Sequence, residues 1–411
     1  MLLKNQKQFL EEIQKYDSIV ILGSSNIGRT MYRYMKSQGV ESKVKGFADN
    51  SLGPVKESKL FQLPNQRLVE YGEYKENALL LICVAPRFYH VAEQLRAQAG
   101  FKNEAFVEYE FYCSISKEEN VPLDFLCAGF TKCGTTSLQA VLRKHKQIYL
   151  PKQKETNYFH WRRKYEDSPE RHKRKYYNEV GEGMMIGDIE PTYHEGASAA
   201  YECYGKDLKL IFMMRNPADA TYSYFRMMMR RTKKRKQVEY YRKFKKFDVR
   251  MFDLYIEDYI LSGKEKRYCY ADCIEQYLKY FDLKNIKFVF LEEIIQNPTK
   301  VMDEIQEFIG VKRKKYTQLP YVNSGKAVSK NYWSARINHY LFRWRLGMKG
   351  NTSSFMNKLY FWVQEIVRPI TLVDNREKMT EESHKVLNEY YKDNVKRLEK
   401  LCGRSLEGLW Y

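Results

Sequence analysis

The sequence predicts an α/β protein in which a P-loop-type parallel-sheet domain (118–411) is preceded by a smaller Rossmann-like α/β domain (1–117). A chain of 411 residues with 44% hydrophobic residues is long enough for two domains with a core each. Short apolar strands alternate with amphipathic helical segments, which is the order typical of parallel sheets. The polar segment Ser114–Pro122 predicts the boundary between the domains.

The elements of the first domain follow from periodicity. Apolar residues at helical spacing, or in short continuous runs, identify helices and strands respectively. We expect helices at Met1–Tyr16, after Gly28 and at Phe88–Ala99, and strands at Ser18–Leu22, Lys43–Ala48 and Ala78–Val84.

A glycine loop follows the first of these strands. Gly23–Gly28 reads G-S-S-N-I-G, in which Ser25 replaces the middle glycine of the dinucleotide fingerprint, and Asp49 follows the next strand. With the sequence G-F-A-D-N at Gly46–Asn50, this segment resembles the Rossmann-like domain that precedes sugar acyltransferases and other polysaccharide enzymes. The resemblance implies a nucleotide or nucleotide-sugar site at Gly23–Gly28 and Asp49, or a docking domain without a ligand.

The second domain is organised around Asp124–Leu142, D-F-L-C-A-G-F-T-K-C-G-T-T-S-L-Q-A-V-L. A buried strand leads into a loop bracketed by Gly129 and Gly134, and helical periodicity starts at Thr136. A loop of this kind directs backbone N–H groups and the positive end of a helix dipole at one point, which attracts phosphate or sulfate. Lys132 precedes the second glycine, whereas the Walker A lysine follows it.

The loop resembles the 5′-phosphosulfate loop of sulfotransferases that use PAPS (3′-phosphoadenosine 5′-phosphosulfate). Leu208–Phe225 resembles the 3′-phosphate motif of the same family, a strand that ends in Arg-Asn-Pro with a serine on the next helix. The resemblance implies PAPS as the sulfuryl donor and no metal ion. The residues that it assigns to donor binding are Lys132, Gly134, Thr135, Thr136, Ser137, Arg215, Ser223 and, in the loop Asn323–Asn331, Lys326.

Residue chemistry agrees with these assignments. Lys132 would place a point charge over the leaving oxygen, and the Arg215 guanidinium offers a fork of donors to a phosphate. Asn216 is expected to cap the next helix, with Pro217 at its first position.

Transfer to a hydroxyl also needs a base. Leu150–His160 resembles the Lys-Glu-x-x-[FY]-Phe segment of the glycan sulfotransferases, which implies Glu155 as the catalytic base. Ile186–Tyr193 resembles a second segment of that branch, but Ile189 replaces its lysine, and Asp188 and Glu190 remain alternative bases. His160 and His194 are further alternatives, because a histidine suits neutral pH.

The formal net charge of +20 predicts an anionic partner. The resemblance implies a glycan or lipid-linked saccharide as acceptor, in the biosynthesis of a capsule or other surface polysaccharide. The N-terminus has no apolar segment of signal or anchor type, which predicts a cytoplasmic enzyme. The aromatic and cationic segment Leu341–Val373 predicts peripheral contact with the inner face of the membrane.

Two other functions fit parts of the sequence. A P-loop nucleotide kinase or NTPase would explain the glycine loop, but the lysine is misplaced and no carboxylate pair is placed for magnesium. A nucleic-acid-binding protein would explain the positive net charge, of which the basic stretch Arg226–Lys246 is a part. No recognised motif of that class is present, so no nucleic acid is expected as a partner.

Overall fold

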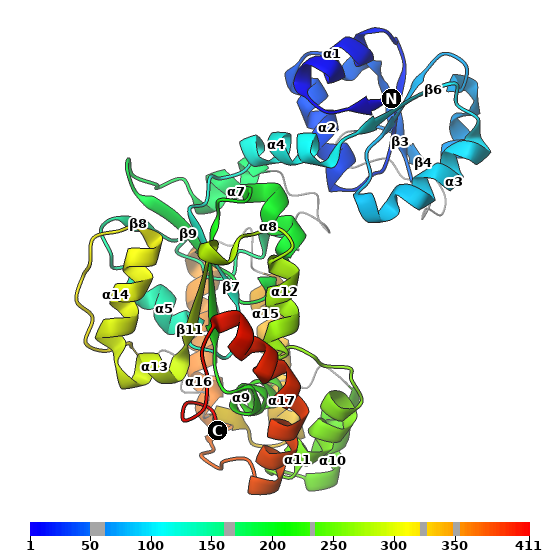
Figure 1. Cartoon of the computed structure of the whole chain (residues 1–411). Helices are drawn as coiled ribbons and strands as arrows, with labels where there is room; N and C mark the ends of the chain where they lie inside the picture. The colour runs from blue at the N-terminus through cyan, green and yellow to red at the C-terminus, as the bar shows by residue number, and fades with distance from the viewer. Residues whose placement is uncertain (50–61, 160–168, 231–234, 321–326, 348–353) are drawn as a thin grey trace.

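The computed structural model describes residues 1–49, 62–159, 169–230, 235–320, 327–347 and 354–411. It contains two parallel sheets, one in each predicted domain, and a two-stranded antiparallel sheet of β12 (Ala327–Ser329) and β13 (Leu372–Asp374). Figure 1 shows the N-terminal sheet and its helices as a separate body above the second sheet, with α4 leading from one to the other.

The N-terminal sheet has the strand order β1-β6-β5-β2-β3-β4, and every pairing in it is parallel. Helices on both sides bury apolar clusters against it, as in doubly wound folds. The strands are β1 (Leu2–Leu3), β2 (Ile19–Leu22), β3 (Val44–Ala48), β4 (Asn65–Gln66), β5 (Leu79–Ile82) and β6 (Asn103–Val107), and the helices are α1 (Gln6–Gln14), α2 (Asn26–Ser37), α3 (Tyr89–Ala99) and α4 (Tyr109–Glu119).

The expected helix at Met1–Tyr16 is shorter than predicted. Leu2 and Leu3 form β1, which pairs with β6, and the helix begins only at Gln6 because the Asn5 side chain caps it by accepting from the Gln8 backbone. Strand pairing with a segment about a hundred residues away overrides the helical periodicity of the first residues. The local sequence carries no information about this distant partner.

The segment expected as a polar linker is mostly helical. Helix α4 runs to Glu119 and buries Phe111 and Ile115, four residues apart, on one face. The connection to the second sheet is therefore the short stretch 120–124. Glu202 accepts hydrogen bonds from the Tyr109 hydroxyl (2.7 Å) and the Tyr112 hydroxyl (2.8 Å), so α4 is also fixed to the second domain.

The second sheet has the order β11-β10-β7-β9-β8, again with only parallel pairings. Its strands are β7 (Phe125–Gly129), β8 (Ile148–Tyr149), β9 (Met185–Ile189), β10 (Lys209–Met214) and β11 (Ile286–Phe290). β7 lies between β9 and β10, so the loops that leave these three strands meet at one edge.

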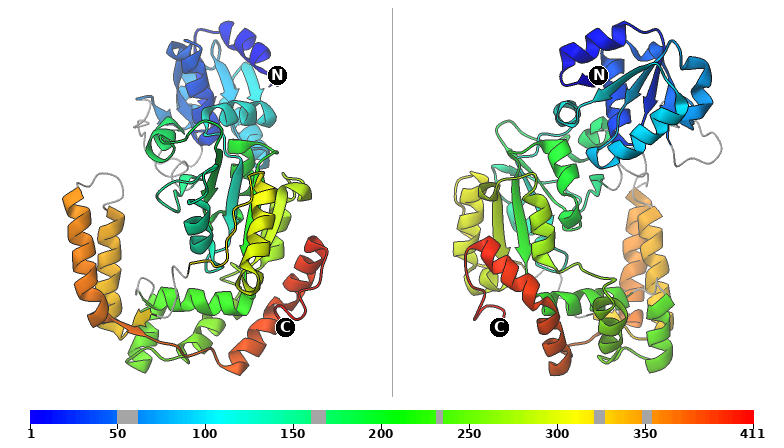
Figure 2. Two further views of the ribbon diagram at one scale, coloured as in Figure 1. Left: turned by 90° about the vertical axis from the view of Figure 1, so that its left-hand side faces the viewer. Right: turned by 45° about the vertical axis from the view of Figure 1, so that its right-hand side comes forward.

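Helices surround this sheet and extend beyond it. They are α5 (Thr135–Leu142), α7 (Pro169–Tyr176), α8 (Ala197–Tyr204), α9 (Pro217–Met229), α10 (Arg235–Phe244), α11 (Met251–Tyr255), α12 (Tyr270–Tyr277), α13 (Leu291–Gln296), α14 (Pro298–Ile309), α15 (Tyr332–Gly347), α16 (Ser354–Thr371) and α17 (Glu381–Cys402). In the left view of Figure 2, α15 and α16 form an antiparallel hairpin that stands to one side of the sheet. No described helix is long and apolar enough to cross a membrane.

Candidate active site

Three strand ends bring the predicted site residues together. The loop 130–134 leaves β7, Arg215 directly follows β10, and Glu190 directly follows β9. Because the carboxyl ends of parallel strands lie at the same edge, residues up to about ninety positions apart in sequence become neighbours.

A cavity of about 950 Å³ lies at this edge. It is lined by all the predicted donor-site residues that the structure describes, namely Lys132, Gly134, Thr135, Thr136, Ser137, Arg215 and Ser223, and also by Glu155 and Lys154. Lys326 lies outside the described residues. Among the described residues, no group of three or more His, Cys, Asp or Glu side chains could hold a metal ion.

The loop after β7 has an unusual backbone. Lys132 has φ +67° and Gly134 has φ +89°, and a lysine in this left-handed region carries a steric cost that ordinary turns avoid. Gly134 also has no room for a side chain, since an added Cβ would lie 2.8 Å from the Leu291 Cδ1. The bend orients the first N–H groups of α5 toward the cavity, and no side chain caps that helix.

Two buried tyrosines hold the loop and the neighbouring strand end. The Tyr268 hydroxyl donates to the Thr131 carbonyl (3.1 Å), and the Tyr270 hydroxyl donates to the Arg215 carbonyl (2.8 Å). These bonds fix the two backbone segments that carry Lys132 and Arg215. No sequence pattern points to this role, because Tyr268 precedes α12 and Tyr270 begins it, far from either motif.

The electrostatics of the cavity favour an anion. Burial and, to a smaller extent, the nearby positive charges of Arg230, Arg215 and Lys154 together lower the pKa of Lys132 to about 8. Within the described part of the chain, the Lys132 ammonium has no hydrogen-bond or ion-pair partner. A cluster of like charges with an unneutralised ammonium gains free energy when a phosphate or sulfate enters it.

Arg215 and Ser223 form the second half of the cavity. As predicted, Asn216 caps α9: its side chain accepts from the backbones of Ala218 and Asp219, and Pro217 is the first helical residue. Arg215 contacts the Asp219 carboxylate at 3.1 Å and remains 28% exposed on the cavity side.

The C-terminus supports the start of this helix. Glu292 accepts from the Asn216 backbone (2.9 Å) and from the Trp410 indole (3.1 Å), and Trp410 is buried. The closing residues of the chain therefore hold the Arg215–Asn216 turn in place.

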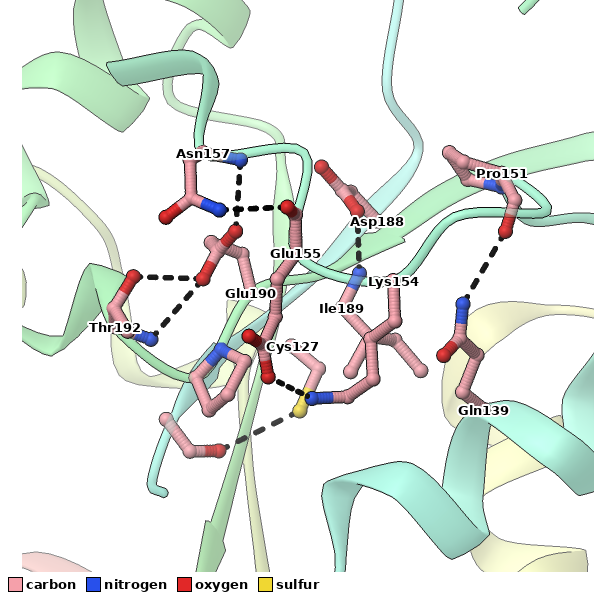
Figure 3. A network of polar contacts seen from close by, with 12 residues as sticks. Cys127, Gln139, Pro151, Lys154, Glu155, Asn157, Asp188, Ile189, Glu190 and Thr192 are labelled. Carbon is pink, nitrogen blue, oxygen red and sulfur yellow. Dashed lines mark hydrogen bonds and ion pairs between the residues drawn. The ribbon is translucent and has the colours of Figure 1, made fainter. Parts of the chain in front are cut away.

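Glu155 lies opposite the loop, on a strained turn of its own. Glu155 has φ +63° and Asn157 has φ +55°, again in the left-handed region. The Glu155 carboxylate pairs with the Lys154 ammonium at 2.8 Å and is 45% exposed, whereas the Lys154 side chain is only 14% exposed (Figure 3). Among the described residues that line the cavity, Glu155 is the one carboxylate, and Lys132, Lys144, Lys154 and Arg215 are the cations.

The alternative bases Asp188 and Glu190 are placed differently. Both are buried, and neither lines the cavity. Asp188 accepts from the Thr156 hydroxyl (2.8 Å), and Glu190 accepts from the Asn157 backbone (2.9 Å) and the Thr192 hydroxyl (2.7 Å; Figure 3). The two carboxylates thus hold the residues that immediately follow Glu155.

Burial controls the ionisation of this pair. It raises the pKa of Asp188 to about 6, and it raises the pKa of Glu190 to about 7 together with repulsion from Asp188. Of the histidine alternatives, His194 does not line the cavity: it is buried against Phe130, and burial lowers its pKa. His160 lies outside the described residues.

Comparison with known proteins identifies the second domain. Residues 122–400 match the family model of the sulfotransferase domain. A sulfotransferase from Alicyclobacillus acidocaldarius is a solved structure with 20% identity and a TM-score of 0.44, covering 71% of this chain and 99% of its own. Mouse sulfotransferase SULT7A1 complexed with PAP has 13% identity and a TM-score of 0.37, covering 70% of this chain and 90% of its own. The search of curated protein sequences finds no match.

The buried carboxylates predict a pH-dependent stability. A carboxyl whose folded pKa is raised binds more protons in the native state than in the unfolded state, so its stabilising effect is present at pH 4 and is lost as the pH rises through about 6. Relative to Asp188→Asn, the wild type should therefore lose about 2–3 kcal/mol of unfolding free energy between pH 4 and pH 8. Urea titrations followed by fluorescence measure this difference.

The matched control is Glu179→Gln, which removes an exposed carboxylate that pairs with Lys152. Its unfolding free energy should follow the wild type at every pH. Parallel curves for the wild type and Asp188→Asn would mean that Asp188 is ionised without penalty in the native state.

Proposed function

Because the chain belongs to the sulfotransferase family, we propose that it transfers a sulfuryl group from PAPS to a hydroxyl or amine of a glycan or lipid-linked saccharide. The proposal places the enzyme in the biosynthesis of a capsule or other surface polysaccharide, in the cytoplasm. The observation that carries it is the single cavity that contains Lys132, Arg215, Ser223 and Glu155.

The cavity has two cationic centres that suit a nucleotide with phosphates at both ends. Lys132 and the N–H groups of α5 would hold the 5′-phosphosulfate, and Arg215 with Ser223 would hold the 3′-phosphate. PAPS supplies an activated sulfur–oxygen bond that breaks as the acceptor oxygen bonds to sulfur. The Lys132 ammonium would neutralise the charge that develops on the leaving phosphate oxygen.

Glu155 is the proposed base that removes the acceptor proton. It is the carboxylate exposed in the cavity, and the Lys154 ammonium orients it at 2.8 Å. Asp188 and Glu190 act in this proposal as positioning residues, since they hold Thr156 and Asn157 directly after the base. Strain at Glu155 requires such support, because an unsupported turn would relax to ordinary backbone angles.

The hairpin of α15 and α16 suits an acceptor carried at a membrane surface. Several of its large apolar side chains are exposed, namely Trp333, Ile337, Tyr340, Phe361, Trp362, Ile366 and Ile370. Trp333 and Trp362 are 72% and 61% exposed, and Trp333, Ile337 and Tyr340 share one face of α15. Between residues 332 and 371 the sequence has several lysines and arginines but only one acidic residue, Glu365. Exposed aromatics beside cations are typical of helices that lie on anionic bilayers.

The binding of PAP (adenosine 3′,5′-bisphosphate) tests the donor site. Lys132→Ala and Arg215→Ala should each weaken PAP binding about tenfold to a hundredfold, the usual effect of losing a charged hydrogen bond. Calorimetry without magnesium measures this affinity, and ATP in place of PAP tests the kinase alternative. Equal affinity of the wild type and both variants for PAP would rule out this site.

The matched variant Lys132→Arg isolates the effect of the low lysine pKa. Above pH 8 most of Lys132 is neutral, so a bound phosphate should raise its pKa and draw in a proton. Arginine stays protonated and should take up none. Titration in two buffers of different ionisation enthalpy counts the protons, and the same uptake in both proteins would contradict the assignment to Lys132.

Replacement of Glu155 separates binding from transfer. Glu155→Gln should keep the affinity for PAP within a few fold and lower the transfer of labelled sulfate to saccharide acceptors by about 10²–10⁴-fold, the usual contribution of a general base. Glu179→Gln is the matched surface control. Full transfer by Glu155→Gln, together with its loss in Asp188→Asn or Glu190→Gln, would assign the base to the buried pair.

Vesicle binding tests the hairpin. The wild type should cosediment with vesicles of phosphatidylcholine mixed with phosphatidylglycerol, and less with phosphatidylcholine alone or at high salt. Phe361→Ser and Trp362→Ser should each weaken binding about tenfold or more, because each removes an aromatic side chain from the bilayer contact. Leu261→Ser and Leu283→Ser, at exposed apolar positions outside the hairpin, are the matched controls. Equal loss in all four variants would assign the effect to general hydrophobicity.

A further inference from the structure

A second cavity, of about 1150 Å³, lies where the N-terminal domain meets the sulfotransferase domain. Its N-terminal wall comes from the loops after β2, β3 and β5 and from α3. Its other wall comes from α8 and from the residues Lys279 and Tyr280 that follow α12. Nothing in the proposed sulfuryl transfer uses this cavity.

The cavity lies at the topological switch point of the N-terminal sheet. From β2 the chain passes through α2 to β3 on one side, whereas β5 pairs with the other side of β2. The loops after β2 and β5 therefore diverge and leave a crevice between them. Open parallel sheets bind their ligands in such crevices, at the carboxyl ends of the strands.

The loop after β2 is built for close backbone approach. Gly23 has φ +112°, and an added Cβ would lie 2.3 Å from the Cys83 carbonyl oxygen. An added Cβ on Gly28 would lie 1.9 Å from the Gly23 carbonyl oxygen, so the first turn of α2 packs directly on the loop. The Ser25 side chain does not cap α2, so the N–H groups of the first turn of the helix are left at the cavity edge. A phosphate placed there would accept hydrogen bonds from these groups and interact favourably with the helix dipole.

Polar and apolar groups on the same wall match a nucleoside. Asp49 at the end of β3 accepts a hydrogen bond from the Ser24 hydroxyl at 2.5 Å, and an acid at this strand end is the usual partner of ribose hydroxyls. Phe88, Val91 and Leu95 provide an apolar side for a base, and the Phe88 ring is 46% exposed.

The wall from the sulfotransferase domain selects the second half of the ligand. Ser198, Lys279 and Tyr280 bring hydroxyl and ammonium groups to the cavity, which suit a polyhydroxylated group. Glu202 adds a carboxylate that also accepts from the Tyr109 and Tyr112 hydroxyls. The volume exceeds the usual range of about 300–1000 Å³, which leaves room for more than a mononucleotide.

We propose that this interdomain cavity binds a nucleoside diphosphate sugar, with the phosphates at the start of α2, the ribose at Asp49 and the sugar at the α8 wall. One short segment of the chain connects the two cavities, since Pro191 lines the donor cavity and Ser198, seven residues later, lines this one. A ligand at α8 thus contacts the segment that leaves the buried Asp188–Glu190 pair.

The test uses the full chain with the donor loop disabled by Lys132→Ala and Arg215→Ala. Calorimetry with UDP-, GDP-, ADP- and CDP-sugars, the matching nucleoside diphosphates and NAD should show binding of at least one nucleotide sugar, tighter than its nucleoside diphosphate and than NAD. Adding Asp49→Ala should weaken this binding about tenfold to a hundredfold. Phe88→Ala, at an exposed position, should also weaken it and leaves the core of the domain untouched.

Glu76→Ala is the matched control, because Glu76 is an exposed carboxylate of the same domain outside the cavity. Its affinity should equal that of the parent. The proposal is overturned if no nucleotide sugar binds, if neither Asp49→Ala nor Phe88→Ala weakens binding, or if binding occurs only with an intact donor loop. PAP binding to the wild type is measured in a separate titration. Absence of nucleotide-sugar binding would therefore not contradict the proposed donor site.

Discussion

The repulsion between cations around Lys132 is the constraint on which the rest of the site depends. Lys132, Lys154, Arg215 and Arg230 are close enough that burial and mutual repulsion lower the pKa of Lys132 to about 8. Such a cluster is unfavourable in the empty protein and is held together by the sheet, the strained loop and the tyrosine hydroxyls of Tyr268 and Tyr270. The cost of assembling it is recovered when an anion binds.

The carboxylates divide into two kinds because of where the strands place them. Glu155 is exposed in the cavity and paired with Lys154, whereas Asp188 and Glu190 are buried behind the same turn. The exposed group can exchange a proton with a substrate, and the buried groups can hold the turn. The sequence left all three as candidate bases, because Glu155 lies in one segment that resembles the family and Asp188 and Glu190 lie in another.

Much of the site could be predicted from the sequence, because the loop after β7 and the Arg-Asn-Pro turn are local structures. The residues predicted to bind the donor, Lys132, Gly134–Ser137, Arg215 and Ser223, line one cavity, and Asn216 caps α9 as expected. The residues that hold the site in place from distant segments could not be predicted, because no local sequence pattern marks them. Tyr268, Tyr270 and Glu292 each form a hydrogen bond with a backbone group of the site that is far away in the sequence. The strand at Leu2–Leu3 and the length of α4 were missed for the same reason, since each depends on partners elsewhere. Lys326 lies outside the described residues and stays a prediction.

The sequence by itself determined the α/β class and the family and predicted an anion-binding loop, because strand, glycine turn and helix start are encoded within about twenty consecutive residues. Only the tertiary structure decided which carboxylate is exposed in the cavity that Lys132 lines and where the cavity of the N-terminal domain lies. Both outcomes depend on strand order, with β7 between β9 and β10 and β2 between β3 and β5. Strand order is fixed by packing between segments far apart in the chain, and no local pattern of residues records it.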